Sequence, residues 1–149
     1  MENKSTSLWA KVTATIPKTK EKVWEVLTNP KLTEQYMYNC QLHSTWKLGS
    51  EAVWKEKQDD GTWQDHVVAE VLAYKPYEHL AFKIFHKATE EQSRAVSELH
   101  FNLDTVANST LLTIKQGDFN AMASAKKNHQ ACQQGWEYVL PKLIASCNT

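Results

Sequence analysis

The sequence predicts an α+β domain in which a curved antiparallel sheet wraps around one long C-terminal helix, with short helices after the first strand. Three observations predict this fold class. Strand-like runs follow one another between residues 45 and 117 with turn signals between them. A helical period is sustained from residue 122 to residue 145, and a shorter helical pattern lies near the N-terminus.

The first elements are a strand and a short helix. "SLWAKVTATI", residues 7–16, alternates in polarity and carries β-branched residues, as a strand does. Apolar residues at helical spacing follow in residues 23–27, and Asn29-Pro30 predicts the end of that helix. A second turn or two of helix is expected around residues 32–36.

Consecutive strands come next. Asp60-Gly61 lies between two strand-like runs and is a strong hairpin signal. "HLAFKIFHK", residues 79–87, and "SRAVSELHFNLD", residues 93–104, alternate with a period of two. Asn108-Ser109 predicts a turn into a last strand, "TLLTIKQG", residues 110–117.

The chain ends in one amphipathic helix. Its inward positions recur at intervals of three and four: Met122, Ala125, His129, Cys132, Trp136, Val139, Leu140 and Leu143. Gly135 costs about 1 kcal/mol relative to alanine in mid-helix, so we expect another backbone to approach closely there. Pro141 either kinks the helix or marks a point where it restarts.

Length and charge limit the class of protein. The 149 residues correspond to one domain, 1–149. Seventeen basic and 17 acidic side chains cancel, which argues against nucleic acid or an anionic membrane surface as a partner. No apolar run is long enough for a membrane helix. The odd cysteine count and the polar N-terminus predict a cytoplasmic protein with reduced thiols.

The order and spacing of several motifs resemble the START-like or SRPBCC helix-grip superfamily, in the branch named after the activator of the ninety-kilodalton heat-shock protein's ATPase. "VWEVLTNPKLTEQY", residues 23–36, is similar to the early helix of that branch, with Tyr36 in place of the usual tryptophan. Leu48-Gly49 and Asp60-Gly61 match its turns. "AEVLAYKPYEHL", residues 69–80, matches its next strand, with alanine in place of the usual first glycine.

The resemblance continues to the end of the chain. "SELHFNLD", "STLLTIKQGDF" and "QGWEYVLPKL", residues 97–104, 109–119 and 134–143, are similar to the last two strands and the final helix. The resemblance implies a helix-grip fold. It does not imply a reaction, because this superfamily includes binding proteins, cyclases, lipid carriers and co-chaperones.

A strongly twisted sheet covered by one long helix often leaves a space in which a small molecule binds. Strand parity and helical spacing predict which side chains surround it. The candidate ligand-binding residues are Tyr36, Trp54, Val71, Phe82, Phe101, Met122, His129, Cys132 and Trp136. The alternative is that the large rings fill this space and form a solid core.

Catalytic and metal sites have weak support. His129 and Cys132 lie three apart, but no third orienting group or oxyanion hole is indicated. The spacing of the other histidines and cysteines is not that of a metal site. Among the acids, Glu56 has the strand parity of an inward residue. We therefore predict no catalytic residue, no metal and no cofactor.

The sequence leaves three roles open. The first is a protein that binds a small apolar or amphipathic molecule, lipid-like or aromatic, between the sheet and the C-terminal helix. The second is an interaction protein that stimulates a chaperone ATPase, as the name of the branch implies. The third is a cyclase-like or hydrolase-like enzyme that uses the same cavity. We expect a monomer or a homodimer.

Overall fold

The computed structural model describes residues 7–86, 95–121 and 124–148. Its elements are β1 (Ala10–Ile16), α1 (Lys20–Thr28), α2 (Pro30–Thr33), β2 (Cys40–Ser44), β3 (Glu51–Lys57), β4 (Trp63–Lys75), β5 (His79–His86), β6 (Ala95–Val106), β7 (Ser109–Gly117), the short 3₁₀ helix η1 (Phe119–Ala121) and α3 (Ala125–Ser146). The strands form one antiparallel sheet in the order β1-β7-β6-β5-β4-β3-β2. This confirms the predicted α+β class.

The two short helices follow β1 as predicted, and capping side chains define them. Thr19 caps α1, its hydroxyl accepting a hydrogen bond from the backbone N–H of Lys22 at 3.2 Å. Asn29 ends α1 and also caps α2, because its side chain accepts from the N–H of Lys31. Pro30 occupies the first turn of α2, where its missing N–H costs nothing. The Asn-Pro boundary is therefore confirmed, and α2 begins at once at Pro30.

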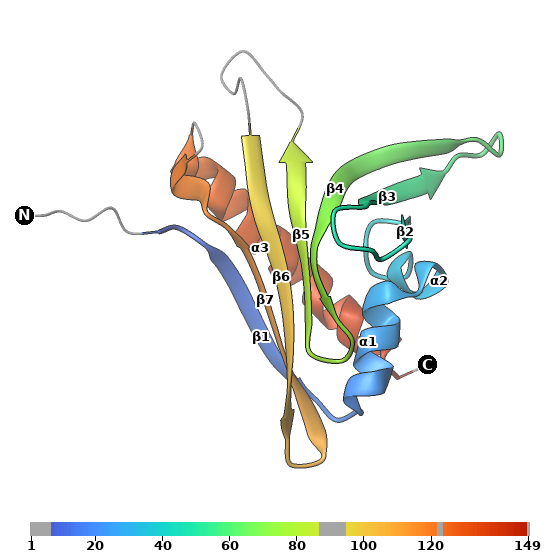
Figure 1. Cartoon of the computed structure of the whole chain (residues 1–149), viewed down its shortest axis with the longest axis vertical. Helices are drawn as coiled ribbons and strands as arrows, with labels where there is room; N and C mark the ends of the chain where they lie inside the picture. Colours follow the sequence, from blue (N-terminus) through green and yellow to red (C-terminus); the bar gives the residue numbers. More distant parts are fainter. Residues whose placement is uncertain (1–6, 87–94, 122–123, 149) are drawn as a thin grey trace, which may run out of the picture.

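The sheet bends around α3 because β4 is irregular at two points. The pairing register shifts between Trp54 and Lys55 on the β3 side, and between Val71 and Ala73 on the β5 side. Such bulges bend a strand and increase its twist. Figure 1 shows β4 curving while α3 crosses one face of the sheet, with the C-terminus beside α1.

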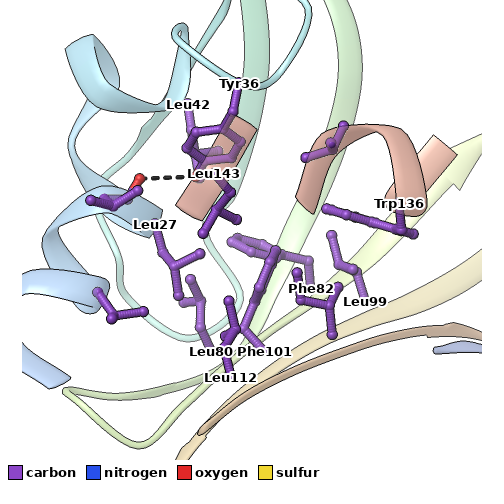
Figure 2. Close-up of a cluster of buried hydrophobic side chains, with 14 of the residues drawn as sticks. Leu27, Tyr36, Leu42, Leu80, Phe82, Leu99, Phe101, Leu112, Trp136 and Leu143 are labelled. Carbon is purple, nitrogen blue, oxygen red and sulfur yellow. Dashed lines mark hydrogen bonds between the residues drawn. The ribbon is translucent and has the colours of Figure 1, made fainter. Parts of the chain in front are cut away.

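The core lies between this face of the sheet, α1 and α3. Figure 2 shows leucines and aromatic rings from all three layers meeting there. Phe82 at its centre is fully buried and meets the Trp54 ring edge to face, with 5.0 Å between centroids. Tyr36 is buried with its hydroxyl donating to the backbone oxygen of Val26 at 2.8 Å, and burial raises its pKa well above the usual range.

Helix α3 differs from the prediction in three details. It begins at Ala125, and Met122 lies outside the described residues. The helix continues through Pro141 as one element, so the expectation of a restart is wrong. The expected backbone approach at Gly135 is also wrong, because a Cβ there would meet the Tyr38 hydroxyl oxygen, at 3.9 Å.

Candidate functional site

A pocket of about 530 Å³ opens between α3 and the β3–β7 part of the sheet. Most of its surface is apolar and comes from the side chains of Trp54, Val67, Ile84, Leu99, Trp136 and Val139. The volume is within the range of small-molecule sites, which combine apolar walls with a few placed polar groups. The large rings therefore do not fill all the space between sheet and helix.

Gln116 on β7 is the polar centre of one side of the pocket. Its side-chain oxygen accepts hydrogen bonds from the Trp136 indole N–H at 3.0 Å and from the Cys132 thiol at 3.3 Å. Its amide nitrogen donates to the Ser97 hydroxyl at 2.9 Å. The bond from Trp136 holds its ring against the pocket, and the bonds from Trp136 and Cys132 use both lone pairs of the Gln116 side-chain oxygen.

Glu56 on β3 and His66 on β4 line the opposite side. His66 Nε2 lies 2.9 Å from Glu56 Oε1. Both side chains are partly exposed, at 40% for His66 and 33% for Glu56, so solvent screens the electrostatic part of their interaction. The sheet places β5 and β6 between this pair and Gln116. The pocket thus has a polar group on each side and an apolar middle.

A ring stack borders the pocket where α3 meets the turn before β2. Tyr38 lines the pocket and stacks on Tyr138 of α3, with centroids 5.9 Å apart and planes 17° from parallel. The Lys142 ammonium lies 4.9 Å from the Tyr138 ring centre, a cation–π contact. Both tyrosines are 56% exposed. The stack joins the turn to the helix at the rim of the pocket.

Two thiols belong to the pocket wall and are poor nucleophiles there. Burial, with a smaller contribution from the nearby Glu56 carboxylate, raises the pKa of Cys40 to about 11. Burial also raises the pKa of Cys132 to about 11, against a smaller lowering by the neighbouring Trp136 indole N–H. Because the thiolate is the reactive form, both cysteines act as small apolar wall residues near neutral pH.

The structure places the predicted ligand-binding residues in three settings. Trp54, Cys132 and Trp136 line the pocket. A second group lies in the packed core beneath it: Tyr36, Val71, Phe82 and Phe101. His129 lies apart, with its Nε2 3.0 Å from the backbone oxygen of Trp9, and Met122 lies outside the described residues.

His129 and Cys132 do not form a nucleophile–base pair. The imidazole of His129 bonds to the backbone of Trp9, whereas the thiol of Cys132 bonds to Gln116. Within the described residues, no group of three or more His, Cys, Asp or Glu side chains is arranged to hold a metal ion. Over the same ranges, no helix has the length and hydropathy needed to cross a bilayer.

Sequence reasoning missed His66, Gln116 and Tyr38. Gln116 and Tyr38 carry no motif, and their roles depend on partners distant in the chain. His66 is hidden by the register shift at Trp54/Lys55, which leaves it without a paired residue on β3. For the Glu56–His66 pair, the signal in the sequence was the inward parity of Glu56, and the structure places that residue in the pocket wall.

Comparisons with known proteins bear on the fold and the family. Residues 18–147 match the family described as "Activator of Hsp90 ATPase homolog 1-like protein". A search of curated proteins found no match.

Several solved structures are similar to the chain. Protein MLL2253 from Mesorhizobium loti aligns with a TM-score of 0.76 at 21% identity, over 94% of this chain and 96% of that one. CalU16 from Micromonospora echinospora gives 0.71 at 14% identity, over 93% of this chain and 75% of that one. DynU16, from the dynemicin biosynthetic locus, gives 0.73 at 19% identity, over 97% of this chain and 48% of that one.

At these identities the structural likeness shows the shared fold. The family match covers most of the chain and confirms the resemblance seen in its motifs. The chain therefore belongs to the family of Activator of Hsp90 ATPase homolog 1-like proteins, on the START-like, SRPBCC scaffold.

Proposed function

We propose that this protein binds a small apolar or amphipathic molecule, aromatic or lipid-like, in the pocket between the sheet and α3. The observation that carries the proposal is the pocket of about 530 Å³ with walls of Trp54, Trp136 and aliphatic side chains. An apolar ligand in this space would remove apolar surface from water on both partners. The raised pKa values of Cys40 and Cys132 favour binding over nucleophilic chemistry.

Binding is tested first with the protein as purified. Native mass spectrometry followed by denaturing extraction should release a small apolar or amphipathic compound if a tight ligand accompanies the protein. In parallel, the ligand-free protein is titrated with N-phenylnaphthylamine, whose fluorescence rises in apolar surroundings. We expect saturable binding at a single class of site.

A matched pair of variants locates the site. Val67 lines the pocket, whereas Val68 is the next residue of β4 and lies outside the lining. Val67→Trp should weaken probe binding at least several-fold because the indole occupies part of the pocket. Val68→Trp should bind like the wild type. Equal binding by both variants, with both folded by circular dichroism, would show that the probe binds elsewhere and would refute the proposal.

A further inference from the structure

His66 meets Glu56 in the pocket wall through a local irregularity of the sheet. Side chains of a regular strand alternate between faces. His66 and Val67 are consecutive residues of β4, and both line the pocket. Trp54 pairs with Val67 and Lys55 pairs with Asp65, which leaves His66 as the extra residue of a bulge. Bulges are known to redirect a side chain toward a functional site.

The chemistry of the pair is that of a hydrogen-bond acceptor. A carboxylate only accepts hydrogen bonds, so the contact of 2.9 Å to Glu56 makes His66 Nε2 the donor. In a neutral imidazole the second nitrogen, Nδ1, then carries a lone pair and accepts. Two atoms of the pair therefore remain available as hydrogen-bond acceptors: Nδ1 of His66 and the second carboxylate oxygen of Glu56.

Gln116 differs from this pair although it also lines the pocket. Its side-chain oxygen already accepts from Trp136 and Cys132, and its amide nitrogen donates to Ser97. The two lone pairs of the oxygen are therefore both used, and a hydroxyl that donates a hydrogen would have to displace Trp136 or Cys132 in order to bind there. The Glu56–His66 side is thus the better place for a donating hydroxyl of a bound molecule.

We propose that the ligand carries a hydroxyl group, phenolic or alcoholic, that donates its hydrogen to the Glu56–His66 pair while its apolar body lies between Trp54 and Trp136. This inference rests on the proposed binding function and specifies its ligand class. The hydroxyl orients the ligand, and the apolar walls hold the remainder. Such an acceptor favours ligands with a hydroxyl over ligands without one. A ligand that lacks the hydroxyl displaces water from the acceptor and gives it no hydrogen bond in return.

The test uses three probes of one shape: β-naphthol, its methyl ether and naphthalene. The ether keeps the oxygen but has no hydrogen to donate. Binding to the folded protein is followed by quenching of tryptophan fluorescence or by calorimetry. We expect β-naphthol to bind about tenfold more tightly than either of the others, which is the size of one hydrogen bond to a charged or polarised acceptor.

Variants assign the preference to the pair. The double variant Glu56→Leu/His66→Phe removes both acceptors and should bind the three probes with equal affinity. Glu56→Gln should retain only a small preference, because the tautomer of His66 is no longer fixed. His43→Phe is the matched control, since His43 lies on β2 outside the pocket lining, and it should keep the full preference.

Two kinds of failure are distinguishable. Equal affinities of the three probes for the wild type, or a preference that survives in the double variant Glu56→Leu/His66→Phe, would overturn the hydroxyl inference and leave the binding proposal intact. Absence of binding by all three probes and by N-phenylnaphthylamine would overturn the binding proposal itself, and the hydroxyl inference with it.

Discussion

Gln116→Met should destabilise the protein, because Gln116 is the acceptor that holds the Trp136 indole. The Trp136 side chain is only 7% exposed, and its N–H donates to Gln116 at 3.0 Å. Methionine has a similar length but offers only a weak acceptor. A buried donor left without a partner costs about 1–3 kcal/mol, and the weak thiol donor of Cys132 adds little.

We therefore expect the free energy of unfolding to fall by about 2 kcal/mol, equivalent to a fall of about 4–8 °C in Tm. Urea denaturation followed by circular dichroism measures the change, with the slope against urea unchanged. Gln130→Met, at an exposed position of α3, is the matched control and should leave stability as it is.

A double-mutant cycle isolates the hydrogen bond. Trp136→Phe removes the indole donor, so Gln116→Met should cost less in that background than in the wild type. We expect an interaction energy of about 1–2 kcal/mol between the two positions. If the two changes add to within roughly 0.5 kcal/mol, the indole has an alternative acceptor and the reasoning about Gln116 is refuted.

The remaining predictions concern two glycines and the thiols. Gly135→Ala should raise stability by about 1 kcal/mol, because alanine favours the helix and its Cβ would meet only the Tyr38 hydroxyl, at 3.9 Å. Gly117→Ala should lower stability by about 1–3 kcal/mol, because its Cβ would lie 2.8 Å from the Trp9 ring. Thermal melts of the two alanine variants measure the change in Tm, which should rise for Gly135→Ala and fall for Gly117→Ala. A rise in both or a fall in both would contradict the packing around these two glycines. Burial raises the pKa of three thiols, Cys40, Cys132 and Cys147, from the ordinary 9.0 to about 11 in the folded protein. Because the unfolded chain loses these protons first, the free energy of unfolding should fall as the pH rises from 9 toward 11. Urea denaturation at several pH values measures it, and a free energy of unfolding that does not change over this range would contradict the burial of the thiols.

The elements that could be predicted from sequence are those with long periodic patterns or strong local signals. Residues 97–104 of β6 alternate between buried and more exposed positions, and Asp60-Gly61 forms the predicted hairpin turn, with Gly61 at a φ of +89°. Asn29-Pro30 separates α1 from α2 by side-chain caps that depend only on neighbouring residues. The resemblance of the motifs also predicted the family, and the family match over residues 18–147 confirms that prediction.

The pocket could be predicted only in part. Strand parity predicts which face of the sheet a side chain occupies, but it does not predict whether that side chain borders a cavity or is packed in the core. Phe82 and Trp54 both face inward, yet Phe82 is packed in the core while Trp54 borders open space. The difference arises from the bend of the sheet. Similarly, the bulge at His66 depends on the pairing register, and the position of the Tyr38 hydroxyl near Gly135 depends on a turn distant in sequence.

Binding of a small molecule between the sheet and α3 can be followed at the pocket wall itself. Indole N–H resonances in two-dimensional NMR report on it, because two of the six tryptophans, Trp54 and Trp136, line the pocket. Titration with β-naphthol should shift the signals of these two and leave Trp9 unmoved, since its ring packs near Lys115 and His100. Unchanged Trp54 and Trp136 signals, with shifts confined to the other indoles, would contradict binding in this pocket.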